Sequence, residues 1–125
     1  MSKLNRVRVR RTVCDELRRT HAYRQALQHP EGIEPDGIEF MQAWVKVADD
    51  LLESLRQEPD GKSRAEFACD MFGLKGRRQP MRYVYARAER LYHVSEDGLK
   101  RWRESIVFTA SILAVKHSAI DLSSE

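Results

Sequence analysis

The apolar side chains of residues 37–57 recur at spacings of three and four, and this pattern constrains the fold of the chain most. The apolar face holds Met41, Trp44, Val45, Ala48, Leu51, Leu52 and Leu55, and the opposite face holds Lys46, Asp49, Asp50 and Glu53. A helix with one apolar and one charged face buries the apolar face against a core. We therefore expect a long amphipathic helix here, with its Trp44 side pointing inward.

The same periodicity predicts further helices, separated by segments rich in proline and glycine. Five helices are expected, over residues 4–28, 37–57, 63–72, 80–91 and 95–117. Asp36 is placed to cap the second helix, and Ser63 with Glu66 has the capping-box spacing for the third. No segment has a convincing strand pattern. We therefore predict an all-α fold.

The length of 125 residues is about that of one domain. Within a single helical domain, we expect residues 1–60 to form a helical hairpin and residues 61–117 to form a bundle. Residues 118–125 are short and polar, and they are expected to be a mobile tail.

The two cysteines and the hydropathy of the chain bear on its compartment. Cys14 and Cys69 are far apart, form no CxxC pair and lie in apolar contexts, which favours reduced core thiols. No stretch approaches the roughly 20 apolar residues that span a bilayer, and the first residues lack the apolar region of a secretory signal. We expect a cytoplasmic protein without a membrane partner.

Charge is distributed unevenly along the chain, although the net charge is only +3. Residues 1–28 contain eight Lys or Arg and two acids, residues 29–60 two and nine, and residues 61–103 eleven and five. One strongly positive face is typical of a nucleic-acid binder. The acidic middle fits a surface away from DNA, or a site for a basic partner or RNA polymerase. The cations near the start fit either a phosphate-binding arm or a solvated helix end, and they are Lys3, Arg6, Arg8, Arg10 and Arg11.

Residues 86–103 carry the sharpest functional signal, the pattern of a helix-turn-helix. An apolar-patterned segment runs into a turn around His93 and Val94, and Ser95 stands where a new helix needs an N-cap. Glu96 and Asp97 follow, where the helix dipole favours negative charge, so that the cap function is the preferred interpretation of both.

The second helix of this pattern has an apolar and a cationic side. Leu99, Trp102 and Ile106 would face the core, and Lys100, Arg101 and Arg103 would point elsewhere. Two residues depart from the usual motif, because Glu89 stands where a small Ala is common and His93 where a Gly supplies positive φ. These departures predict a longer turn. The alternative is an ordinary helical hairpin with a Ser cap.

Residues 82–116, which include AERLYHVSEDGLKRWRESI, resemble the C-terminal helix-turn-helix of small phage-encoded transcriptional regulators of the ArpU and RinA type. Those proteins are in turn similar to region four of sigma factors. The resemblance covers about the last third of the chain. It implies action on phage late genes or related mobile-element promoters. It places on or near DNA the residues Ser95, Glu96, Gly98, Lys100, Arg101 and Arg103.

The residues themselves support DNA contact on physical grounds. Gly98 would permit close backbone approach, and Lys100 or Arg101 would reach guanine edges or phosphates. Arginines in the preceding loop and helix would contact the DNA backbone, which gives affinity without sequence choice. These are Arg77, Arg78, Arg82, Arg87 and Arg90.

Residues 105–115 contain no charge, although they lie in the last predicted helix. Phe108, Ile112 and Val115 form a second apolar stripe beside the Leu99 and Trp102 stripe. A helix that is apolar nearly all round is buried on more than one side. It is either the central helix of the fold or a site of homo-oligomer formation.

Residue patterns for catalysis, metals or cofactors are weak. The four histidines have no zinc spacing, no glycine-rich phosphate loop is present, and Asp49 with Glu53 lacks a third ligand at ligand spacing. We therefore predict no enzyme, no metal site and no cofactor. The expected function is a sequence-specific DNA-binding transcriptional regulator of phage or mobile-element type that binds double-stranded DNA. The alternatives are a phage DNA-packaging subunit of the small terminase kind and a helical interaction module without nucleic-acid binding.

Overall fold

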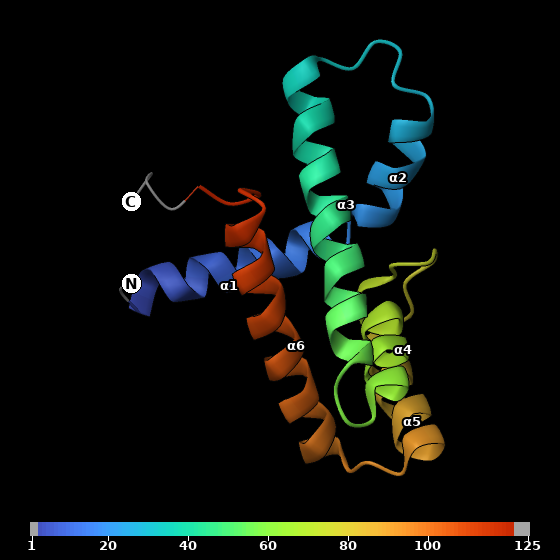
Figure 1. The fold of residues 1–125 in the computed structure, drawn as a ribbon. Coiled ribbons are helices and arrows are strands. Elements are labelled where there is room, and N and C mark those ends of the chain that lie inside the picture. Colours follow the sequence, from blue (N-terminus) through green and yellow to red (C-terminus); the bar gives the residue numbers. More distant parts are fainter. Residues whose placement is uncertain (1–2, 122–125) are drawn as a thin grey trace.

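The computed structural model describes residues 3–121, and these residues contain six α-helices joined by turns and loops (Figure 1). The helices are α1 (Lys3–Leu17), α2 (Thr20–Gln28), α3 (Pro35–Arg56), α4 (Gly61–Phe72), α5 (Met81–Tyr92) and α6 (Glu96–Lys116). No strand occurs within these residues, so the predicted all-α fold class is confirmed. Residues 122–125 of the predicted tail lie outside the described part of the chain.

The helix predicted over residues 4–28 is two helices, which is why the structure has six and not five. The helical path breaks at Arg18 and Arg19, where the Thr20 hydroxyl donates a hydrogen bond to the Leu17 carbonyl at 2.8 Å. A local bond of this kind competes with continued helix. After the break, α2 packs against α3, whereas α1 packs against α6. The apolar period continues across the break, because Val13, Leu17 and Thr20 are all buried, and the sequence pattern therefore concealed it.

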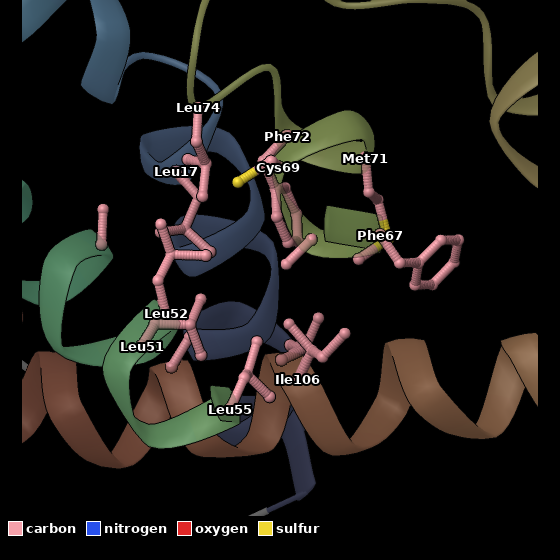
Figure 2. Packing of buried hydrophobic residues seen from close by; sticks show 14 of the residues in the cluster. Leu17, Leu51, Leu52, Leu55, Phe67, Cys69, Met71, Phe72, Leu74 and Ile106 are labelled. Carbon is pink, nitrogen blue, oxygen red and sulfur yellow. The ribbon is translucent and has the colours of Figure 1, made fainter. Parts of the chain in front are cut away.

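Helix α3 is the central element, because it packs against α1, α2, α4 and α6. Trp44, Leu51 and Leu55 on its predicted inward face are fully buried. Figure 2 shows Leu55 of α3 in one cluster with Leu17 of α1 and Ile106 of α6. Burial of one such side chain stabilises the fold by roughly 1.5–3 kcal/mol, so this shared cluster joins helices from distant parts of the chain.

The predicted caps of α3 and α4 are wrong, and chain geometry explains both starts. Glu34 is the N-cap of α3 and Pro35 its first residue, so Asp36 lies inside the first turn. Helix α4 begins at Gly61, directly after Asp60 in the left-handed conformation. A Cβ at residue 61 would lie 2.5 Å from the Leu55 carbonyl oxygen. Only glycine fits at residue 61 of this tight α3–α4 turn. Helix α4 starts at this glycine, two residues before Ser63, so Ser63 is not its N-cap.

Both cysteines are buried and free of disulfides, as the sequence predicted. Burial raises the pKa of the Cys69 thiol, which keeps it protonated and unreactive. Across residues 3–121, none of the helices combines the length and the apolar character that a bilayer span requires.

Candidate nucleic-acid interface

Helices α5 and α6 are joined by a turn of three residues, His93 to Ser95. His93 adopts the left-handed conformation, with φ of 55°, and its amide donates to the Glu89 carbonyl at 3.1 Å. The positive φ that glycine often supplies is thus adopted here by histidine. The turn does not lengthen, and the expectation of a longer turn was wrong.

The N-terminus of α6 is capped as the sequence predicted. The Ser95 hydroxyl accepts a hydrogen bond from the Gly98 amide at 3.1 Å, and Glu96 and Asp97 lie in the first turn. These groups satisfy a free amide and complement the helix dipole. Ser95 therefore has a structural function at the start of α6.

The inward face of α6 is also as predicted. Leu99 and Ile106 are fully buried, and Trp102 is 7% exposed. The Trp102 ring lies 6.1 Å from the Phe67 ring of α4, centroid to centroid, and the Arg64 guanidinium lies 4.9 Å above the indole. Aromatic and cation–π contacts of this geometry add stability beyond area burial. They fix the rotation of α6 about its axis.

This rotation leaves Lys100 and Arg101 on the exposed side of α6. The Lys100 ammonium lies 3.8 Å from the Glu96 carboxylate, and the two side chains are 60% and 64% exposed. An exposed pair of this kind contributes little and is easily exchanged for another anion. Among residues 3–121, Arg101 has no hydrogen-bond or ion-pair partner. The two cations stand on the surface within the first two turns after Ser95.

Gly98 has a packing function that the sequence analysis missed. A Cβ at this position would lie 2.7 Å from the Cγ1 atom of Val94. The missing side chain therefore makes room for Val94, which folds back over the first turn of α6.

The arginines of α5 and of its preceding loop are divided among different surroundings. Arg77, Arg82 and Arg90 are exposed, and Arg82 lies 5.0 Å from the Tyr83 ring centroid. Arg87 is exposed but forms an ion pair with Asp70 of α4 at 2.5 Å. Arg78 is likewise exposed, so four of the five predicted backbone-binding arginines have no acidic partner among the described residues.

Arg78 and Arg103 belong to a different group, which includes Arg18, a residue that sequence reasoning missed. Burial lowers the pKa of Arg78 first, and the positive charges of Arg18 and Arg103 lower it further. The three side chains come from segments far apart in the sequence, the end of α1, the loop before α5, and α6. No sequence pattern predicts that Arg18 acts on Arg78, because this depends on how separate helices pack.

The second apolar stripe of α6 is exposed. Phe108, Ile112 and Val115 are 69%, 55% and 43% exposed. They line a groove of about 540 Å³ between α1 and α6, whose lining also includes Val9 and Val107. At this groove, Arg10 of α1 donates a hydrogen bond to Glu104 of α6 at 2.8 Å. Helix α6 is therefore not buried on all sides.

No group of three or more His, Cys, Asp or Glu side chains gathers in a metal-binding arrangement within the described chain. Asp49 instead forms an ion pair with Arg24 of α2, and Asp50 pairs with His117 at 2.6 Å. These acids connect helices, which is a structural function.

Comparisons with protein-family models, with curated proteins and with solved structures found no match to this chain. The resemblance of residues 82–116 to ArpU and RinA type regulators therefore stays a prediction from the residues that carry it.

Proposed function

We propose that this protein binds double-stranded DNA through the N-terminal half of α6 and regulates transcription from phage or mobile-element promoters. The observation that supports this best is the division of α6 into two faces. Leu99 and Trp102 anchor the helix to the core, and Lys100 and Arg101 stand exposed next to the three-residue turn. Side chains in the first turns of a recognition helix are those that reach base edges in the major groove.

The surroundings of α6 add favourable electrostatics. Arg77, Arg82 and Arg90 are exposed on the preceding loop and on α5, where they suit contacts with backbone phosphates. The connection between α2 and α3 lies at the opposite end of the molecule from the α5–α6 turn (Figure 1). The exposed acids Glu31 and Glu34 of this connection, and Asp36 and Glu39 at the start of α3, are thus far from the proposed DNA surface.

The direct test is binding to a labelled duplex of random sequence at several salt concentrations, measured by fluorescence anisotropy. Each phosphate neutralised by Lys or Arg contributes about −0.9 to the slope of log K against log salt. We expect a steep negative slope, followed by recovery of a preferred sequence from selection among random duplexes. Absence of salt-sensitive binding to DNA or RNA would favour the interaction module instead.

We further propose that two copies of the chain associate through the groove between α1 and α6. The same patch contains a protruding ridge, Phe108 and Ile112, and a recess floored by Val9 and Val107. A two-fold interface needs such a self-complementary surface, because each copy presents the same residues. Residues 105–115 of α6 contain no charge, so burying them between two copies removes no charged side chain from water.

The exposed ridge also favours a second candidate function, a DNA-packaging subunit of the small terminase kind. A regulator and a packaging subunit differ in stoichiometry. Light scattering of the purified chain separates them, because a dimer fits the regulator and a ring of many subunits fits packaging.

A further inference from the structure

The groove between α1 and α6 has the size and the surface of a small-molecule site. Its volume is about 540 Å³, and pockets that bind small molecules have roughly 300–1,000 Å³. From Val107 to Val115 the apolar wall runs for about 12 Å along α6, at a rise of about 1.5 Å per residue. An alkyl chain of medium length is about as long when extended. The apolar side chains of the groove are Val9, Val107, Phe108, Ile112 and Val115.

The polar groups of the groove are few, and most of them are already paired. Arg10 donates a hydrogen bond to Glu104 at 2.8 Å, so the charges of these two side chains compensate each other. The Ser111 hydroxyl donates to the Val107 carbonyl, also at 2.8 Å. Arg6 lines the groove as well, and in the part of the chain that the structure describes no side chain pairs with it. The groove therefore has one uncompensated positive charge beside an apolar surface.

These two features together favour an amphipathic anion as the ligand. An alkyl chain gains free energy by leaving water for the apolar wall. A carboxylate at its end accepts two parallel hydrogen bonds from the Arg6 guanidinium. A sugar or a nucleotide fits less well, because the Arg10 and Ser111 donors already have partners within the protein. A cationic amphiphile is repelled by Arg6.

We propose that the groove binds the anion of an amphipathic carboxylic acid, with its alkyl chain against Phe108 and Ile112 and its carboxylate at Arg6. This ligand covers the same ridge and recess that the second copy uses. Binding of the ligand and association of two copies therefore exclude each other, a step that rests on the association proposed above. The ligand thus regulates the assembly of the protein.

The test is calorimetric titration of the full chain with sodium octanoate, below the concentration at which octanoate forms micelles and at constant ionic strength. A parallel titration with 1-octanol, which has the same chain length and no charge, measures the apolar contact alone. We expect the wild type to bind octanoate about fivefold more tightly than octanol, because only octanoate pairs with Arg6. The site is overturned if octanoate does not bind, or if octanol binds equally well.

Two variants locate the ligand in the groove. Arg6→Gln changes an exposed residue and is expected to bind octanoate only as tightly as octanol. Arg11→Gln is its matched control, because Arg11 is exposed on the same helix and does not line the groove. Ile112→Ser, at a side chain that is 55% exposed, is expected to weaken the binding of both ligands. Equal octanoate affinity of the two arginine variants, or unchanged binding by Ile112→Ser, overturns the proposal.

Light scattering in saturating octanoate separates this proposal from the association on which its regulatory step rests. A wild-type dimer is expected to become a monomer. A dimer that keeps its mass with octanoate bound overturns the exclusion of the second copy by the ligand. A wild-type chain that is monomeric without octanoate, and that binds octanoate through Arg6, overturns the proposed association alone and supports the ligand site.

Discussion

The Tyr92 ring at the end of α5 packs against the Trp102 indole of α6, with centroids 6.1 Å apart. The Tyr92 hydroxyl also donates a hydrogen bond to Glu66 of α4 at 3.0 Å. One side chain therefore connects the last turn of α5 to both of its neighbours. Because the three-residue turn begins at the next residue, this contact fixes the position from which α6 starts.

Trp102→Ala removes the central ring of that contact. Its loss from a buried position is expected to lower the free energy of unfolding by about 3–5 kcal/mol. Urea unfolding followed by circular dichroism measures the change, and Lys100→Ala on the exposed side of the same helix is the control. A variant as stable as the wild type would mean that α6 is rotated relative to the face assigned here.

The contribution of Tyr92 depends on pH. Burial, and then the hydrogen bond to Glu66, raise the pKa of Tyr92 to about 12 from its usual value near 10. The folded state thus favours the protonated phenol, so the stabilisation is complete below pH 10 and is lost as pH rises towards 12. Tyr92→Phe is expected to lose about 1 kcal/mol below pH 10.

The free energy of unfolding of Tyr92→Phe should therefore vary less with pH between 10 and 12 than that of the wild type. Some variation remains in this variant, because burial also raises the pKa of Tyr23 to about 12. Parallel curves for the two proteins would contradict the assigned hydrogen bond.

The left-handed conformation of His93 makes a prediction for the turn. A β-branched residue is strained at this φ, so His93→Val is expected to cost about 1–2 kcal/mol. His93→Gly adopts the same conformation freely and is expected to unfold at a Tm equal to or above that of the wild type. Thermal unfolding of the two variants side by side measures the difference. If the valine variant matched the glycine variant, residue 93 would not turn the chain in this way.

The exposed ridge on α6 is tested through assembly. Phe108→Ser removes a side chain that is 69% exposed, so folding stability should change by less than about 0.5 kcal/mol. We expect this variant to be monomeric in light scattering where the wild type is a dimer. Phe40→Ser is the control, because Phe40 is 45% exposed on α3, outside the groove. Equal loss of assembly in both variants would contradict an interface at the groove.

Helical periodicity predicted the core well where one helix carries one stripe. Trp44 and Leu51 of α3, and Leu99 and Ile106 of α6, are buried as expected. The break between α1 and α2 escaped prediction, because Thr20 continues the apolar stripe in position although its hydroxyl ends the helix locally. Periodicity reports which face is buried, and it is blind to a change of direction that keeps the same face inward.

The candidate site was predictable to the extent that it is local in sequence. The Ser95 cap and the exposure of Lys100 and Arg101 follow from the spacing within residues 95–102. The ion pair of Arg87 with Asp70 did not follow, because it depends on how α4 and α5 pack. The sequence predicted close backbone approach at Gly98, whereas the close packing of Val94 against this residue depends on the three-dimensional turn.

The most direct test of the central claim is the affinity of Lys100→Ala/Arg101→Ala for duplex DNA, beside Lys46→Ala/Arg56→Ala, which removes two exposed cations from α3. We expect the α6 variant to fold normally, to lose at least tenfold in affinity and to have a salt slope smaller by about 1 to 2. The α3 variant is expected to bind as the wild type does. If the wild type binds duplex DNA and the α6 variant binds every duplex with the same affinity, α6 is not the DNA-reading helix.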